Sequence, residues 1–527
     1  MQDKFIVFKK VVLVLLLAII LRLSYVIYPP VMRDESIYSL GACKILHGQI
    51  LYKEVGEERG PLLFIFYALI FKLFGMYNML AINIAGLICS LLILLLLFRI
   101  GMCFWDSKIG VYIGLFYAIF SFYPDLMNRA NTEMLMLLPM VCSVFYFLRA
   151  EEKSCLSLYF MSGLMCGISM LFKQTGGATF LAIVIYFIIL FVFKNKSKLK
   201  LVKNFTIVFA GMLLPILVSI IYFALHHCLN DYIFWSIKLG RIYFTTFGFL
   251  GRIRAFWAMW IRLLIPNMMF WIFAIFAVLS SVTQIYAKLK FKNNLNIRDK
   301  ACLLAVIWAF TSVLAASITG RPYPHYYALV IPPFCILAGV GFLLFLTKYI
   351  NAFKAKTVRL VAISLLVYGF IGPVVTVHGV DIYNRYLFAV KQRSSYKPVL
   401  KEVVRYLNLP KFQENSLLVL DSNPELYIFA HQKCPTRFIS LVFAWGTSPS
   451  VYSIEKVVVP GFFDKFMEDL RKNRPKFIVD SSMFLKTYRW ILPTEHFDRI
   501  YEFVSNNYTL EKEIKEISIY RLNNSIN

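Results

Sequence analysis

Two adjoining stretches near the start of the chain decide its fold: residues 11–28 read VVLVLLLAIILRLSYVIY, and residues 32–38 read MRDESIY. The first stretch is almost entirely apolar and is long enough to cross a bilayer as a helix. The second places Asp34 and Glu35 a few residues beyond that span. Because ionised carboxylates beside a membrane are costly to hold, such residues commonly have a function. The pair therefore indicates acid–base or ligand chemistry at the membrane surface.

The composition extends this interpretation to most of the chain. Its 527 residues are 59% hydrophobic, and the mean hydropathy of +0.67 comes from long unbroken apolar runs. Soluble domains are about half apolar and alternate apolar with polar residues, so the chain is predicted to be a polytopic α-helical membrane protein. About eleven spans are predicted, near 11–28, 79–99, 108–123, 132–149, 156–172, 176–193, 204–225, 264–287, 301–319, 326–347 and 358–378.

The net charge of +27 gives the orientation of these spans. Lys and Arg cluster in alternate loops, and the positive-inside rule makes residues 194–203, 288–300 and 348–359 cytoplasmic, together with the N-terminus. The apolar run Pro61 to Gly75 would invert every later loop if it crossed, so it is predicted to lie in the interface as a juxtamembrane helix. A nucleic-acid partner is not expected, since the basic residues do not alternate with aromatic ones.

The chain changes character near residue 380. Residues 1–379 are predicted to form the membrane core, and residues 380–527 an extracytoplasmic soluble α/β domain in which charged residues occur throughout. Residues 415–420 and 476–480 are predicted as short buried strands. Apolar residues recur at helical spacing in residues 399–407 and 462–471.

Several loops with acidic, basic and aromatic residues share the predicted outer face. They are residues 29–60, 124–133 and 226–262, with two short turns at residues 173–174 and 320–327. Acids and bases beside lipid suit a reaction between a lipid phosphate and a polar acceptor. Arg and Lys can pair with the phosphate, and a carboxylate can accept the proton of the acceptor.

Each of these residues also has a structural explanation that the residues alone leave open. Asp34 and Glu35 could cap a helix that starts near Ser36, because acids stabilise helix N-termini. Glu133 could cap the fourth span in the same way. Lys173 could extend to the interface from between two spans, and His325 could bond only to the backbone.

The ordered motifs resemble a known superfamily. Asp34-Glu35-x-x-Tyr38, followed by Gly48, Tyr52 and Arg59-Gly60-Pro61-Leu62-Leu63, is similar to the opening signature of the dolichyl-phosphate-mannose–protein mannosyltransferases. This superfamily comprises glycosyltransferase family 39 and bacterial relatives such as the lipid A aminoarabinose transferases, which share the GT-C fold. Further resemblances lie in Ala130-Asn131-Thr132-Glu133-Met134 with Pro139, in Phe172-Lys173-Gln174, and in Gly320-Arg321-x-Tyr323-Pro324-His325-Tyr326.

The resemblance implies roles for particular residues. Asp34 would be the catalytic carboxylate, with Glu35 in support, and Arg59 falls where relatives place a Lys or Arg that binds the donor phosphate. By their charge and position alone, Lys173 and Arg321 are expected to neutralise that phosphate together with Arg59. Glu58 falls where some relatives have a metal-binding acid, so a divalent metal is left open and no cofactor is assigned. Two departures are Arg59-Gly60-Pro61 in place of the usual Lys-Pro-Pro, and Asn131 and Glu133 where some relatives have Asp. Residues expected to line the substrate cavity are Tyr38, Tyr52, Asn131, Glu133, Gln174, His325 and Tyr326.

The resemblance also implies an activity. We expect an inverting glycosyltransferase that moves a hexosyl or pentosyl group from a polyprenyl-phosphate donor to a protein, lipid or cell-envelope glycan. The expected location is the outer face of a bacterial plasma (inner) membrane. The alternative is a transporter or flippase of lipid-linked sugars, against which stand the paired acids and the absence of an internal repeat.

Overall fold

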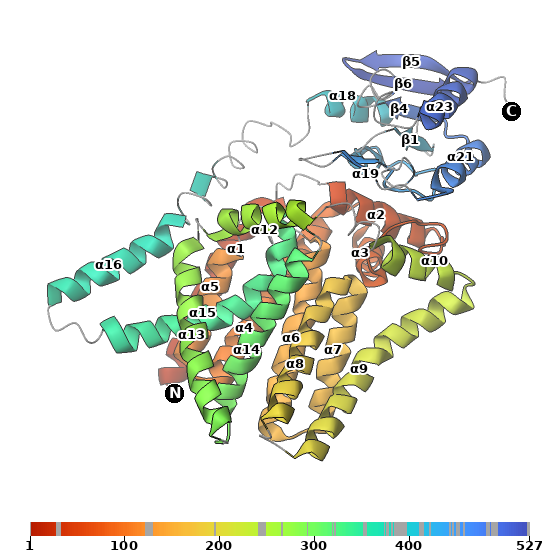
Figure 1. The fold of residues 1–527 in the computed structure, drawn as a ribbon. Coiled ribbons are helices and arrows are strands. Elements are labelled where there is room, and N and C mark those ends of the chain that lie inside the picture. The colour runs from red at the N-terminus through yellow and green to blue at the C-terminus, as the bar shows by residue number, and fades with distance from the viewer. Residues whose placement is uncertain are drawn as a thin grey trace. The chain divides into compact units, whose positions relative to one another are not determined.

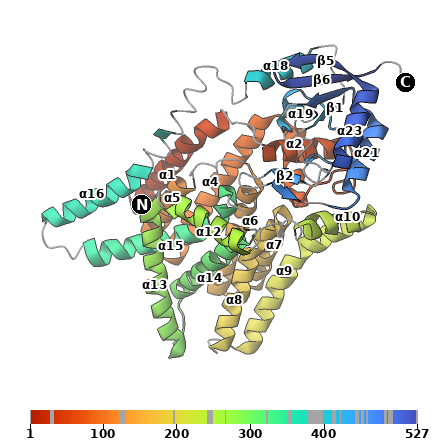
Figure 2. The same ribbon diagram turned by 45° about the horizontal axis from the view of Figure 1, so that its top comes forward.

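The computed structural model groups the chain into two compact units, drawn in Figures 1 and 2. The first unit comprises Met1–Ile27, Asn83–Ile221 and Phe247–Leu387, and the second comprises Tyr28–Ile82, Tyr222–Thr246 and Phe388–Asn527. The residues that the structure describes are 2–27, 33–121, 130–193, 197–240, 249–264, 267–291, 293–318, 320, 323–350, 356–373, 375, 379–380, 383, 398–409, 416–420, 423–441, 444, 447–449, 454–456, 459–480, 485 and 494–523.

Helices make up most of the first unit and are present in the second. The α-helices are α1 (Gln2–Ile27), α2 (Arg33–Leu46), α3 (Pro61–Phe74), α4 (Met79–Phe104), α5 (Ser107–Phe120), α6 (Thr132–Lys153), α7 (Leu156–Phe172), α8 (Ala178–Val192), α9 (Lys198–Leu225), α10 (Leu229–Ile233), α12 (Phe249–Leu264), α13 (Met268–Lys290), α14 (Ile297–Ser317), α15 (Ile331–Phe345), α16 (Lys356–Pro373), α18 (Pro398–Leu407), α19 (Glu425–Phe429), α21 (Phe462–Asn473) and α23 (Thr494–Asn507). Shorter helical turns are η1 (Gln174–Gly177), η2 (Phe234–Lys238), η4 (Pro324–Val330) and η5 (Leu346–Ile350). The strands are β1 (Leu417–Val419), β2 (Thr447–Pro449), β3 (Ile454–Lys456), β4 (Phe477–Asp480), β5 (Tyr508–Ile514) and β6 (Ile517–Leu522).

Over the residues that the structure describes, every predicted span coincides with helical segments. Within the described ranges, seven helical segments are long and apolar enough to cross a membrane by themselves. The helices α5 and α7 are apolar but have 14 and 17 residues, and at 1.5 Å per residue a 14-residue helix reaches only about 21 Å. The juxtamembrane helix predicted after Pro61 is α3, which is also short and apolar. The fold is that of a polytopic α-helical membrane protein.

Glycines bring the membrane helices α7 and α9 into close contact. A Cβ atom on Gly163 would lie 1.9 Å from the carbonyl oxygen of Val208, and one on Gly211 would lie 2.2 Å from that of Phe160. Small residues let helix backbones approach each other in this way. In a bilayer the hydrophobic effect does not drive helices together, so such close packing contacts stabilise the pair. Lys173 directly follows α7, so this packing fixes the helix end that carries it.

A buried carboxylate joins α6 to three neighbouring helices. Glu151 accepts hydrogen bonds from the hydroxyls of Tyr159 (2.5 Å) and Tyr186 (3.1 Å), and the Nζ of Lys300 lies 3.3 Å from its Oε2. These partners come from α7, α8 and α14. A buried charge needs such partners, because leaving it uncompensated is strongly destabilising.

The second unit contains a four-stranded sheet with the order β1-β4-β6-β5. Strands β1 and β4 are parallel, with Leu418 opposite Ile478, and the pairs β4–β6 and β6–β5 are antiparallel. The two strands predicted in residues 415–420 and 476–480 are thus present and buried. The two predicted helices are α18 and α21. The boundary at residues 379/380 and the independent folding of residues 380–527 stay predictions.

The expected start of the helix after the first span was wrong. The helix α2 begins at Arg33 and not near Ser36, so Asp34 and Glu35 lie inside its first turn. The positive end of the helix dipole favours acids in this turn, which allows the helix to extend back through both of them.

The predicted orientation of the spans can be tested by cysteine labelling. In a variant without the ten native cysteines, we expect Lys198→Cys to be protected from an impermeant thiol reagent in intact cells. Lys465→Cys should be labelled, because both side chains are exposed and the basic loops put them on opposite sides of the membrane. Permeabilised cells, in which both positions should react, are the control. Labelling at 198 with protection at 465 would contradict the orientation.

Candidate active site

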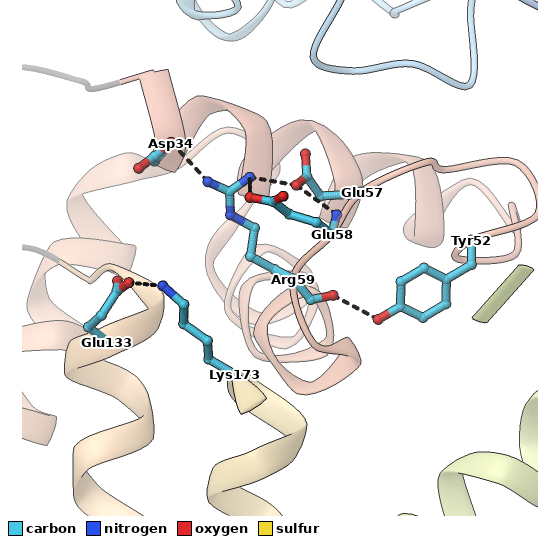
Figure 3. A network of polar contacts seen from close by, with 7 residues as sticks. All are labelled: Asp34, Tyr52, Glu57, Glu58, Arg59, Glu133 and Lys173. Atoms are coloured by element: carbon cyan, nitrogen blue, oxygen red, sulfur yellow. Dashed lines mark hydrogen bonds and ion pairs between the residues drawn. The ribbon is translucent and has the colours of Figure 1, made fainter. Parts of the chain in front are cut away.

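Arg59 in the second unit contacts three carboxylates. Its Nη1 lies 2.5 Å from Oε1 of Glu57 and 3.5 Å from Oε1 of Glu58, and its Nη2 lies 3.2 Å from Oδ1 of Asp34 (Figure 3). The partners come from the first turn of α2 and from the loop before α3, which we call the acidic loop (residues 51–60). A guanidinium with five donors in a planar fork can hold several carboxylates at once.

Helix α2 positions Asp34 and Glu35 differently. The side chain of Asp34 is 36% exposed, whereas Glu35 is buried. One turn later Tyr38 is buried edge-on against Tyr67 of α3, with 5.6 Å between ring centroids. The Arg59 guanidinium lies 5.5 Å from the Tyr38 ring, within the range of a cation–π interaction. The accessible carboxylate of the pair is therefore Asp34.

The acidic loop is held by Tyr52. This residue has a φ of 68°, a left-handed conformation that is uncommon for a residue with a side chain. Its backbone N–H donates to Val55 O (2.8 Å), and its hydroxyl donates to Arg59 O (2.7 Å). Its ring lies 5.1 Å from that of Phe223 and 5.3 Å from that of Tyr232. Tyr52 thus bonds to the backbone of the residue that carries the central cation.

Burial and charge act in opposite directions on the Glu57–Arg59 pair. Burial raises the pKa of the Glu57 carboxyl above its ordinary value, and the nearby Arg59 charge only partly opposes this. For Arg59 the balance is reversed. Burial lowers the pKa of its guanidinium, but Glu57, followed by Tyr38, Asp34 and Glu58, outweighs burial, so the pKa lies well above its ordinary value. The pair therefore favours the charged form of Arg59, and the Arg59 charge favours ionisation of Glu57, against the effect of burial.

A second cluster lies in the first unit and is described by itself. Lys173 forms an ion pair with Glu133, which is buried in the first turn of α6. The Nζ of Lys173 lies 3.8 Å from the centroid of the Tyr326 ring. His325 lies edge-on to Tyr326, with 4.8 Å between ring centroids, and interacts electrostatically with Glu133.

Asn131, and not Glu133, caps α6 with its side chain. The Oδ1 of Asn131 accepts a hydrogen bond from the N–H of Met134 at 2.9 Å. Asn is among the best N-cap residues, because its side-chain oxygen reaches an N–H that has no partner within the helix. Glu133 is thereby left to pair with Lys173. The cavity role expected of Asn131 stays a prediction.

The structure places most of the predicted site residues in these two clusters. Asp34, Glu58 and Arg59 are in the first, with Tyr38 and Tyr52 packed around them. Gln174 begins η1 and is exposed, and Arg321 lies outside the described residues. The roles of all these residues stay predictions.

Sequence reasoning missed Glu57 as a site residue. Its side chain is fully buried and it makes the shortest of the three contacts with Arg59. Glu57 and Glu58 are adjacent and chemically alike, and only the packing of the loop decides which of them turns inward. The sole signal was their position directly before Arg59.

Glu58, which the sequence suggested as a metal ligand, does not lie in a cluster of further metal-binding side chains among the described residues. Glu58 contacts Arg59, and no group of three or more His, Cys, Asp and Glu side chains within the described ranges is arranged to hold a metal ion. The described residues around Glu58 therefore do not fit a metal site.

Comparison with known proteins identifies the relatives of this fold. Residues 58–223 match the family model of dolichyl-phosphate-mannose-protein mannosyltransferase. The resemblance to that superfamily is confirmed. The matched segment begins at Glu58 and Arg59 and includes Glu133 and Lys173. No curated protein sequence matches the chain.

Solved structures share the fold at low sequence identity. ArnT from Cupriavidus metallidurans bound to undecaprenyl phosphate is 13% identical with a TM-score of 0.56, covering 97% of each chain. Its apo state gives 14% identity and a TM-score of 0.57 over 99% of this chain and 98% of that one. The archaeal oligosaccharyltransferase AglB from Archaeoglobus fulgidus, in complex with an inhibitory peptide and a dolichol-phosphate, is 13% identical. Its TM-score is 0.54, covering 100% of this chain and 75% of that one. The protein has the GT-C fold of these membrane glycosyltransferases.

Proposed function

We propose that the protein is an inverting glycosyltransferase that takes a hexosyl or pentosyl group from a polyprenyl-phosphate donor. The observation that carries the proposal is the accessible Asp34 carboxylate, held by Arg59 where the match to the mannosyltransferase family begins. Two of the solved structures of similar fold contain a polyprenyl or dolichol phosphate, which supports the choice of donor class.

The reaction needs one base and a stabilised leaving group. Asp34 accepts the proton of the acceptor hydroxyl while the acceptor oxygen forms a bond to the anomeric carbon. The bond between that carbon and the phosphate oxygen breaks on the opposite side, and the polyprenyl phosphate leaves with the electron pair. A single carboxylate is enough, because the phosphate is a good leaving group. Hydrolysis of a glycosidic bond, in contrast, needs a second carboxylic acid that protonates the leaving oxygen.

The proposed location follows the charge pattern. The protein is a multi-pass protein of a bacterial plasma (inner) membrane, with a cytoplasmic N-terminus and an extracytoplasmic domain at residues 380–527. The acceptor is a protein, lipid or cell-envelope glycan on the outer face. The basic residues orient the spans in the membrane and bind the donor phosphate, and a nucleic acid is not among the proposed partners.

A transfer assay tests the proposal. Membranes that contain the full chain are supplied with polyprenyl phosphates bearing radiolabelled hexoses or pentoses, and loss of label from the donor is measured beside membranes without the chain. We expect release of polyprenyl phosphate that depends on the chain and is lost in Asp34→Asn. Movement of intact donor across the bilayer without cleavage would support the flippase alternative and refute the transferase.

Arg59 and Lys173 are each proposed to contact the donor phosphate, and the role of Lys173 is open to a binding test. For Lys173 the best variant is the double change Glu133→Gln/Lys173→Met, which removes both charges without leaving a buried carboxylate unpaired. We expect binding of undecaprenyl phosphate to weaken by about 1.5–3 kcal/mol, the size of a hydrogen bond to a charged group. The measurement is lipid binding by native mass spectrometry or thermophoresis.

A matched control lies at the other end of the same helix. Arg149 and Glu152 form a more exposed ion pair at 2.5 Å, and Arg149→Met/Glu152→Gln should leave binding unchanged. Equal affinity in the two double variants would contradict the role of Lys173.

A further inference from the structure

Gly56, directly before Glu57, lies between an aromatic ring and a carbonyl group. Its N–H donates to Arg437 O at 2.8 Å, in a parallel bridge with Phe438. A Cβ atom at this position would lie 2.4 Å from Cζ2 of Trp235. The acidic loop therefore touches the segment around Arg437 at a point where only glycine fits.

The same segment also touches α2. The Nζ of Lys44, near the end of α2, donates to Thr436 O at 2.9 Å. Three consecutive residues, Thr436 to Phe438, thus contact both the helix that carries Asp34 and the loop that carries Arg59. The segment thus bridges these two elements, beside their direct contacts through Arg59.

Asp469 of α21 fixes the segment. Its Oδ2 accepts hydrogen bonds from the backbone N–H (2.8 Å) and Nε (3.0 Å) of Arg437, and its Oδ1 accepts one from Nη2 (2.8 Å). Asp469 is buried, and α21 also presents Phe462 and Phe466 to the Phe438 ring. Fork geometry of this kind adds directional specificity to the ion pair.

We propose that Arg437 and Asp469 are positioning residues for the candidate active site. Asp469 holds Arg437, the Arg437 carbonyl holds Gly56, and Gly56 sets the place of Glu57 and Arg59 against Asp34. The inference rests on the proposed function, since it assigns a catalytic purpose to this chain of bonds. Displacing a reacting group by about 1 Å can cost on the order of 100-fold in rate, so a distant bond can matter.

Hydrogen exchange in the full-length protein tests the mechanical part without any substrate. In Asp469→Asn, we expect amide exchange in residues 51–60 to accelerate about 10- to 100-fold, the effect of losing a hydrogen bond to a charged group. The matched control is Asp464→Asn on the same helix, where the exposed Asp464 pairs with Arg499 at 2.8 Å. Exchange in residues 51–60 should not change there, and equal exchange in both variants would overturn the proposal.

Transfer kinetics test the catalytic part. Asp469→Asn should lower kcat at least about tenfold with little change in KM for the donor, and Asp469→Glu should restore part of the loss, because it keeps the charge. A folded Asp469→Asn protein with faster loop exchange and unchanged kcat would overturn the positioning role. If the parent protein transfers no sugar, the proposed function fails, and with it the catalytic purpose assigned here, whereas the exchange result would still decide whether Asp469 holds the loop.

Discussion

Asp34→Asn should lower the rate of sugar transfer by about 10²- to 10⁴-fold, the usual contribution of a positioned general base. The variant keeps the size and hydrogen-bonding reach of the side chain but removes the charge that accepts the proton. Binding of undecaprenyl phosphate should survive. The measurement is single-turnover transfer, with binding determined on the same preparation. Glu35→Gln should have a smaller effect, because we assign it a supporting role.

The structural explanation of Asp34 makes a different prediction, since an acid in the first turn of α2 would only stabilise the helix, by about 0.3–1 kcal/mol. Asp106 is a matched control, because its Oδ1 caps α5 by accepting hydrogen bonds from the N–H groups of Lys108 (2.8 Å) and Ile109 (2.9 Å). We expect Asp106→Asn to leave transfer unchanged. A folded Asp34→Asn protein that transfers sugar at the parental rate would leave Asp34 with a structural role alone, in the first turn of α2 and in its ion pair with Arg59.

Arg59→Ala should destabilise the protein by roughly 3–5 kcal/mol, the range found when one partner of a buried ion pair is removed. The reason is that the side chain of Glu57 is fully buried and would be left without the guanidinium of Arg59, the cation that it pairs with. The measurement is the thermal unfolding midpoint in detergent, with chemical unfolding as a second probe. The double variant Arg59→Ala/Glu57→Gln is the control and should recover much of the loss.

The loss in Arg59→Ala should also depend on pH. The pKa of Glu57 is already raised from 4.5 in the folded protein, and removal of Arg59 raises it further. Between the pKa of Glu57 in the unfolded protein and its higher pKa in the folded variant, the folded state binds more protons than the unfolded state. The stability of the variant therefore falls as pH rises between these two values. We expect the deficit of Arg59→Ala to be smaller at acidic pH than at pH 8, and no such trend in the double variant. A deficit independent of pH would mean that Glu57 is not the stranded charge.

Sequence patterns were sufficient for the elements that depend on local chemistry. The apolar runs gave helices at every predicted span, and the buried strands β1 and β4 followed from short apolar runs. The order of the motifs also predicted that Asp34 and Arg59 belong to one candidate site. The start of α2 at Arg33 was missed, since apolar spacing does not reveal how far a dipole-stabilised first turn extends.

Contacts between distant segments could not be predicted from one sequence. The bond from Gly56 to Arg437 joins residues nearly four hundred positions apart, and no local pattern marks either of them. The choice between Glu57 and Glu58 as the buried acid likewise depends on how the acidic loop packs. The hairpin of β5 and β6 was missed too, because several of its positions are exposed, so it lacks a long apolar run.

The two buried carboxylates of α6 restrict how that helix can move. Glu133 and Glu151 are eighteen residues apart, which is five helical turns and about 27 Å, so both lie on one face. Turning α6 about its axis by a single residue, roughly 100°, would withdraw one acid from Lys173 and the other from Lys300 and its two tyrosines. Rotation of α6 about its axis is therefore opposed at both of its ends. The same contacts tie α6 to Lys173 after α7, to Tyr159 and Tyr186 of α7 and α8, and to Lys300 of α14, so we expect these four helices to move together.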